Sequence, residues 1–387
     1  MFNKHKTARR VTAAVAAAVL CLMSGCSSQQ RNQQPGAARR QMSMVISSDV
    51  PESVRKAAEE FANRVAYYSD GELQISLSES QKLKSVLNAS DTEFAMVLNE
   101  QLTDDLPELT TLELPFYFKH ADNQFSALNS ERTRTLLNRM IRRVYPMQVQ
   151  MATACGYEDF AADASVDLTD FRKQYPLAVK RSFFVEELQQ DLGAKEIEAE
   201  NPMALLLSGQ AEIATVKLQQ VVSAMERTGE KKELVVLDSA QKIQTVYLLS
   251  GQEVMDSLTP RQRAAVEQAA VMACGYCRVL TDQKHQKEQE QLRRMGVEIL
   301  PINLEKYYAM LGDIYQYESD RMLYQPDAEL DRVMRSDSVK ETFSRCEVLG
   351  SRQSFGLAAQ KHLPVRMEIR IGGRMFLISR EMLGEIS

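Results

Sequence analysis

Two basic residues, Lys180 and Arg181, stand where binding of an acidic ligand is chemically possible. A short apolar run at 177–180 predicts a strand, and Ser182 is a favourable residue to begin a helix directly after it. The planar guanidinium of Arg suits a carboxylate, and the unpaired amides of a helix N-terminus favour the same anion. The residues by themselves leave two interpretations, an acid-binding site or a solvated basic pair, and favour the basic pair.

A second group, Cys274-Gly275-Tyr276-Cys277, has the C-x-x-C spacing of redox and metal sites. It lies inside a predicted helix on an apolar stripe, away from any helix N-terminus that would activate a thiol. We therefore expect core packing, with a thiol redox protein as the alternative. The four histidines are scattered, and no common catalytic motif is present, so the sequence predicts no catalytic residue, metal site or cofactor.

The elements that must position Lys180 and Arg181 alternate between strand and helix. In the first part of the chain we expect helices at 51–68 and about 122–145, and strands at 42–47, 72–77, 93–98 and 149–155. The alternation predicts an α/β layer with a largely parallel sheet.

The second part of the chain repeats this logic. Helices are expected at 182–192 and from a cap at Asn201 to Gly209, and strands at 177–180, 196–199 and 212–217, followed by return strands at 233–238 and 245–250. A capping box at Thr259–Gln262 then begins one long helix that ends at Gly296. Its first half has an apolar stripe, whereas 281–290 is polar all round, as expected for a bridging or surface segment.

The N-terminus has the pattern of a secretory signal. Basic residues precede an apolar run at 11–23, and a small-residue site ends at Cys26, which resembles a bacterial lipoprotein signal with Cys26 as the lipidated residue. Residues 27–40 lack large apolar side chains and predict a flexible tether. All 52 acidic residues lie after residue 40, whereas seven of the 47 Lys and Arg residues lie within residues 1–40, so the body is acidic and unsuited to nucleic acid.

Several short segments together resemble a known family, the extracytoplasmic solute-binding subunits of tripartite ATP-independent periplasmic (TRAP) transporters, of the dicarboxylate-binding type. The matching segments run in family order from about 42 to 305: 61–77, 107–118, Asp167-Leu168, 192–194, 204–209, 258–270 and 296–297. Three departures are clear. The segment before Gly193 is about two residues short, so the family's carboxylate-binding arginine aligns with Arg181 only across a gap. The segment between 73 and 93 is short, and Tyr157-Glu158 stands where the family has its second arginine.

The resemblance assigns roles to four residues. It implies that Arg181 binds a ligand carboxylate, with Lys180 beside it, and that Asn201 is a polar cleft residue, although a helix cap explains Asn201 equally well. Tyr117, in the aromatic run 116–118, would offer a hydroxyl within an apolar cleft wall. The alternative for Tyr117 is the core at a lobe junction.

The resemblance implies an α/β, two-lobed periplasmic-binding-protein-like fold with a long bridging helix and a small C-terminal α+β extension. We expect a signal peptide (1–26), a tether (27–40), lobe 1 (41–156), lobe 2 (157–234), return strands and bridging helix (235–318) and the extension (319–387). The implied function is non-enzymatic: a lipid-anchored, extracytoplasmic protein captures a small organic acid and delivers it to integral membrane permease subunits. The alternative is a degenerate solute-binding fold that serves surface interactions.

Overall fold

The computed structural model describes residues 39–89, 92–118, 120–166, 175–180, 194–228, 233–301, 366–371 and 374–379. Several predictions lie outside these residues: the signal segment with Cys26, nearly all of the tether, Asp167-Leu168, Arg181, the helix at 182–192 and most of the C-terminal extension. No helix in the described part of the chain is long and apolar enough to cross a membrane.

The first part of the chain forms strands β1 (Arg40–Ser47), β2 (Leu73–Ser80) and β3 (Phe94–Leu98) and helix α2 (Glu52–Tyr68). As the spacing predicts, α2 buries Val54, Ala57, Ala58, Phe61 and Val65. The Phe61 ring packs edge-on against Phe94 of β3, with centroids 5.2 Å apart. A short helix α3 (Leu83–Leu87) and 3-10 turns η1 (Asn99–Gln101) and η2 (Pro107–Glu113) complete this part.

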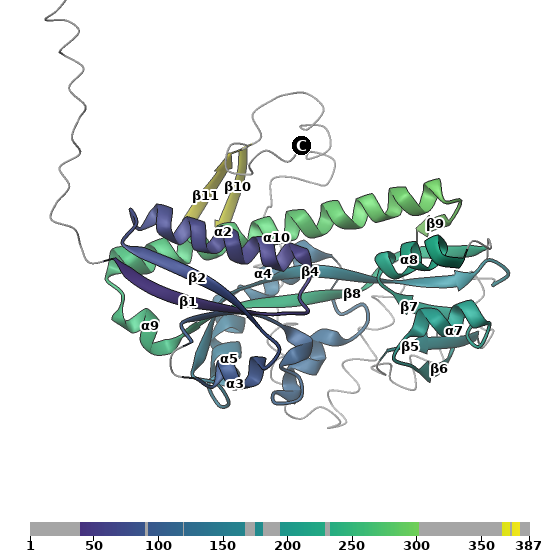
Figure 1. The fold of residues 1–387 in the computed structure, drawn as a ribbon, viewed down its shortest axis with the longest axis horizontal. Helices are drawn as coiled ribbons and strands as arrows, with labels where there is room; N and C mark the ends of the chain where they lie inside the picture. The colour runs from purple at the N-terminus through teal and green to yellow at the C-terminus, as the bar shows by residue number, and fades with distance from the viewer. Residues whose placement is uncertain are drawn as a thin grey trace, which may run out of the picture. The chain divides into compact units, whose positions relative to one another are not determined.

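Two long antiparallel strands, β4 (Met147–Asp163) and β8 (Leu234–Gly251), run side by side through a nine-stranded sheet (Figure 1). The order is β2-β1-β3-β8-β4-β7-β5-β6, with β9 paired to β8. The predictions of separate strands at 233–238 and 245–250, and of a short strand at 149–155, were wrong. The polar stretch between the predicted strands resembles a turn, but Lys242, Ile243 and Gln244 pair with β4, and a register shift in the ladder accommodates the residues before them.

The sheet is mixed, so the prediction of a largely parallel sheet holds for the outer groups of strands and fails at the centre. Strands β1 and β3 are parallel, but the central pairs β3–β8, β8–β4 and β4–β7 are antiparallel. The alternation of strand and helix cannot reveal this, because β4 and β8 are return strands that join the two parallel groups. Mixed α/β class, as expected from the sequence, is confirmed.

The helix expected at 122–145 is two helices, α4 (Ala121–Leu128) and α5 (Glu131–Ile141). Asn129 ends α4, and its side chain binds both the backbone N–H and the carbonyl of Ala152 on β4. Ser130 then caps α5 by accepting a hydrogen bond from the Thr133 N–H at 3.2 Å. A single helix was predicted because the helical spacing of apolar residues continues across the break. The break is stabilised by the contact of Asn129 with β4, which is distant in sequence.

The later elements follow the predicted order closely. They are β5 (Tyr175–Val179), β6 (Ala194–Glu198), α7 (Pro202–Ser208), β7 (Ile213–Val216), α8 (Leu218–Thr228) and β9 (Glu298–Pro301). Strand β5 is parallel to both β6 and β7. In the C-terminal extension, β10 (Arg366–Ile371) and β11 (Arg374–Ser379) pair antiparallel.

The long helix α10 (Pro260–Arg294), which follows α9 (Gln252–Ser257), is confirmed with its capping box. It lies beside α2 (Figure 1) and buries the predicted apolar stripe. Its second half differs from the expectation of a helix polar all round, because Thr281, His285, Gln289 and Leu292 form a buried stripe against the sheet. Their spacing of three to four residues is helical, but polar side chains conceal the buried face from a hydrophobicity pattern.

Cys274 and Cys277 are fully buried in the α10 core, and burial raises the pKa of the Cys277 thiol to about 12. The expected packing role is therefore confirmed. We predict that Cys274→Ala with Cys277→Ala costs about 1–2 kcal/mol of unfolding free energy, measured in urea, and leaves ligand binding unchanged. Loss of ligand binding in a variant that remains folded would contradict a packing role.

Candidate functional site

A cleft of about 980 Å³ lies where two groups of parallel strands point toward each other. Because β8 is antiparallel to β3, and β4 is antiparallel to both β8 and β7, the strands β5 to β7 run opposite to β1 and β3. Both groups therefore end at the middle of β4 and β8. Ligands of open α/β sheets bind at the carboxyl ends of strands, and the volume suits a small molecule.

The cleft walls come from both strand groups. One wall is formed by residues at or just after the ends of β1 and β3, and the other by residues at or just after the ends of β5, β6 and β7. The middle of β4 and β8 forms the floor. The lining residues include Asp49, Leu98 and Glu100 on the first wall, Val179, Lys180, Glu198, Glu200, Thr215 and Lys217 on the second, and Glu158, Gln241 and Lys242 on the floor.

A buried ion-pair network lies at the floor of the cleft. Glu158 and Lys242 are directly opposite in the β4–β8 ladder, and Lys242 Nζ is 3.1 Å from Glu158 Oε1 and 3.3 Å from Glu113 Oε2. Glu113 Oε1 also accepts a hydrogen bond from Asn99 Nδ2 at 2.6 Å. Burial by itself lowers the pKa of Lys242, but the carboxylates of Glu158 and Glu113 reverse the effect and raise it above its usual value. Lys242 is therefore charged, and two carboxylates already neutralise it.

Other lysines of the cleft are more available to a ligand. Lys180 follows β5 and Lys217 follows β7; both side chains are exposed, and neither forms an ion pair with another residue in the described ranges. Lys284 of α10 lies 3.7 Å from Glu288. Lys180 and Lys217 are thus the lysines of this cleft that can attract an anion without breaking an existing pair.

Of the ligand-binding residues predicted from the sequence, Lys180, Asn201 and Tyr117 are described by the structure, and they lie in different surroundings. Lys180 lines the cleft. Asn201 is exposed, and its Oδ1 accepts a hydrogen bond from the Ala204 N–H at 3.3 Å, so it caps α7; its neighbours Glu200 and Pro202 line the cleft. Tyr117 is partly buried and packs edge-on against Phe118, with ring centroids 5.0 Å apart. Their roles toward a ligand stay predictions.

The sequence analysis missed the network of Glu113, Glu158 and Lys242. Glu158 was noted only because it replaces an arginine of the resembled family. Lys242 lies in the polar stretch that resembles a turn between two strands. The one available signal was the opposite charge of Glu158 and Lys242. It could not be used from the sequence, because recognising the pair requires the register of β4 against β8.

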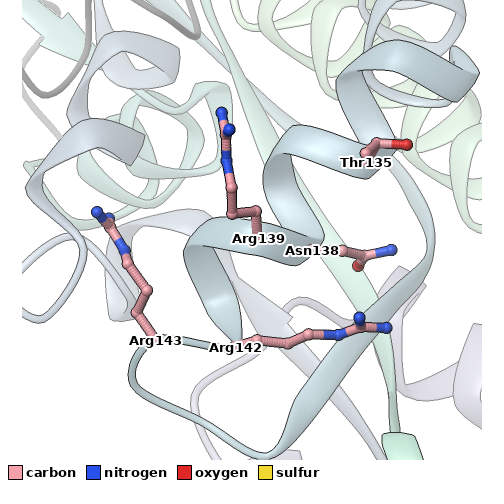
Figure 2. Close-up of a pocket in the computed structure, with 5 residues that line it drawn as sticks. All are labelled: Thr135, Asn138, Arg139, Arg142 and Arg143. Atoms are coloured by element: carbon pink, nitrogen blue, oxygen red, sulfur yellow. The ribbon is translucent and has the colours of Figure 1, made fainter.

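A second pocket, of about 550 Å³, lies over the C-terminal turn of α5 and is lined by Thr135, Asn138, Arg139, Arg142 and Arg143. Figure 2 shows the three guanidinium groups spread apart rather than directed at one point. Arg142 donates to Gln148 and Arg143 to Glu108. Asn138 accepts a hydrogen bond from the Val149 N–H at 2.6 Å, so this pocket is a less favourable candidate than the cleft.

Beside the cleft, a possible metal-binding donor set is formed by Asp159, Asp238 and His285. Their ligand atoms all lie within 4.8 Å of one another. The sequence predicted no such group, because the three residues lie on different elements, β4, β8 and α10.

No family model matches the sequence, and no curated protein matches it. Solved structures match well over most of the chain. A TRAP periplasmic solute-binding protein from Rhodobacter sphaeroides, in an apo open form, is 14% identical, with 78% of this chain and 99% of that chain covered and a TM-score of 0.65.

Two further TRAP periplasmic solute-binding proteins have the same fold. The protein from Ochrobactrum anthropi is 15% identical, with 80% of this chain and 95% of that chain covered and a TM-score of 0.61. The protein from Pseudomonas putida F1, with bound D-glucuronate, is 14% identical, with 82% of this chain and 100% of that chain covered and a TM-score of 0.56. The fold expected from the sequence segments is confirmed: this chain has the fold of the TRAP periplasmic solute-binding proteins.

Proposed function

We propose that this chain is an extracytoplasmic, lipid-anchored solute-binding protein that captures a small organic acid and delivers it to the permease of a TRAP transporter. The observation that carries the proposal is the cleft between two opposed groups of strand ends, with Lys180 and Lys217 at its walls. The acid ligand in the structurally similar protein from Pseudomonas putida, D-glucuronate, supports the same ligand class. The signal pattern that ends at Cys26 supports the location.

In this function the protein performs no covalent chemistry. Arg181, one residue after Lys180, binds the ligand carboxylate, and the exposed lysines attract the anion into the cleft. The strands β4 and β8 and the helix α10 connect the two walls, so bending of these elements closes the cleft on the ligand. Closure distinguishes the loaded from the empty protein for the permease.

A specific observation also favours the alternative, a degenerate fold that serves surface interactions. Glu158 stands where the resembled family has its second arginine, and it lies at the cleft floor against Lys242. With Glu113, the floor carries two carboxylates for one ammonium group. This charge balance disfavours a second contact to a dicarboxylate.

A thermal-shift screen separates the two functions. We expect a monocarboxylate, dicarboxylate or sugar acid to raise the melting temperature of the purified protein. A ligand that binds only the folded state at a hundred times its Kd adds about 2.7 kcal/mol of stability. Uncharged analogues of the same size are the control, and a panel in which no acid acts would favour the interaction function.

The lipid anchor has a direct test. We expect labelled fatty acid to appear on the wild-type protein and to disappear in Cys26→Ser, because lipoprotein processing attaches the lipid to this residue only. Cys21→Ser, which changes a cysteine of the apolar signal segment, should keep the label. Equal labelling of wild type and Cys26→Ser would disprove the anchor.

A further inference from the structure

The buried polar stripe of α10 brings His285 to two carboxylates from the long strands. His285 Nε2 is 3.7 Å from Asp159 Oδ2 and 3.6 Å from Asp238 Oδ1. The side chains of His285 and Asp159 are 6% and 0% exposed. The terminal amide nitrogen of Gln289, one helical turn further along α10, is 3.1 Å from the same imidazole nitrogen. Four polar side chains thus converge on one small region.

Asp159 is only half satisfied. Its Oδ1 accepts hydrogen bonds from the backbone N–H groups of Ser239 at 2.9 Å and Ala240 at 2.7 Å. Its Oδ2 is buried, faces His285 and has no hydrogen-bond donor among the described residues. A buried carboxylate oxygen without a partner is costly, and in native proteins such an atom calls for an explanation, such as a bound ion.

The backbone that holds Asp159 is itself unusual. Ala240 has a φ of 41°, in the left-handed region that disfavours residues with a Cβ atom. The two hydrogen bonds to Asp159 Oδ1 hold this conformation in place. Such strain collects at functional sites, where other contacts maintain it.

We propose that Asp159, Asp238 and His285 bind one divalent transition-metal ion, with Zn²⁺ as the preferred ion. Ligand atoms about 2.1 Å from one tetrahedral Zn²⁺ lie about 3.4 Å apart, close to the two separations from His285. Two carboxylates and an imidazole suit zinc, whereas Ca²⁺ and Mg²⁺ prefer oxygen ligands alone. Rotation of the Gln289 amide by half a turn exchanges its nitrogen and oxygen, so that Oε1 becomes a fourth ligand of the ion.

The proposed ion would connect three elements beside the cleft. Asp159 lies on β4 next to Glu158, and His285 lies on α10 next to Lys284, and both of these neighbours line the cleft. Asp238 belongs to β8. The ion thus fastens α10 to both long strands where these elements connect the walls. This metal site does not depend on the acid-binding function, since its donors are not those assigned to the ligand.

Calorimetric titration of the chelator-treated, full-length protein with ZnCl₂ alone tests the site. We expect one Zn²⁺ per chain, a rise in melting temperature on zinc addition, and no comparable effect of MgCl₂. Co²⁺ should bind with a visible absorption band that reports imidazole and carboxylate coordination. A wild-type protein that binds no Zn²⁺ would overturn the proposal and leave a metal-free ion-pair network.

Variants connect binding to these side chains. His285→Ala should weaken Zn²⁺ binding at least about 100-fold and remove the Co²⁺ band. Asp238→Asn should weaken Zn²⁺ binding at least about 10-fold, and this position is partly exposed, so it tolerates substitution better. His120→Ala is the matched control, because it removes a histidine that caps the N-terminus of α4 and is not one of the proposed ligands, and it should bind Zn²⁺ as wild type does. Zn²⁺ binding by Asp238→Asn as tight as binding by the wild type would overturn the assignment, and this comparison remains decisive if His285→Ala fails to fold.

Discussion

Replacement of Lys242 by alanine is expected to lower the unfolding free energy by about 3–5 kcal/mol, measured in urea at pH 7. The variant leaves Glu113 and Glu158 at the cleft floor without their shared counter-charge, and Glu113 is only 5% exposed. Lys217→Ala is the matched control. It removes an exposed lysine of the same cleft and should change stability by less than about 0.5 kcal/mol.

The pH dependence of this loss has a definite sign. Burial already raises the pKa of Glu113, with Lys242 and the Asn99 hydrogen bond acting against the rise. Without Lys242 the folded-state pKa rises further, so the folded protein binds a proton more readily than the unfolded chain as the pH falls. The fall in unfolding free energy caused by Lys242→Ala should therefore be largest at pH 7 and smaller near pH 5, where Glu113 takes up a proton. An equal loss at both pH values would contradict the ion-pair explanation.

A triple substitution separates charge from packing. Lys242→Met with Glu113→Gln and Glu158→Gln removes all three charges and keeps most of the volume, so it should recover much of the stability lost in Lys242→Ala. If the triple variant is no more stable than Lys242→Ala, the network contributes by shape rather than by charge.

Truncation of Arg181 should weaken binding of an acid found in the thermal-shift screen by about 2–5 kcal/mol, measured by calorimetric titration. Removal of one partner from a desolvated, charge-assisted contact leaves the ligand carboxylate unpaired. Lys180→Ala is the matched control: Lys180 is adjacent in sequence but exposed at the cleft wall, and its loss should cost about 1 kcal/mol or less.

The outcomes of this second experiment lead to different conclusions. An acid that binds Arg181→Ala as tightly as wild type would keep the solute-binding function and move the carboxylate contact elsewhere. Lys217, which follows the neighbouring strand β7 in the same wall, is then the next residue to replace. A binding loss in Lys180→Ala that equals the loss in Arg181→Ala would contradict a specific guanidinium contact.

Local signals in the sequence predicted local structure well. The apolar spacing of α2 identified its buried face, and the Thr259 to Gln262 capping box located the start of α10. Asn201 was recognised as a helix cap and is one. Each of these features depends on residues within one or two turns of each other, so the sequence contains all the interacting partners.

The candidate site could be predicted only in part. Lys180 was identified because it follows a short strand, and it does line the cleft. Lys242 and His285 were not identified, because one lies in a polar stretch that resembles a turn and the other in a helix half that resembles a surface. The carboxylate partners of both residues lie far away in the sequence.

The sequence by itself determined where most of the strands and helices lie, the α/β class and the order of segments typical of this fold. Only the tertiary structure decided that β4 and β8 are continuous, that Glu158 lies opposite Lys242, and that the polar half of α10 is buried. The physical reason is that a polar residue is stable inside a protein only when distant segments provide its partners. Those partners come from strand pairing and helix packing across many tens of residues, which a local pattern does not contain.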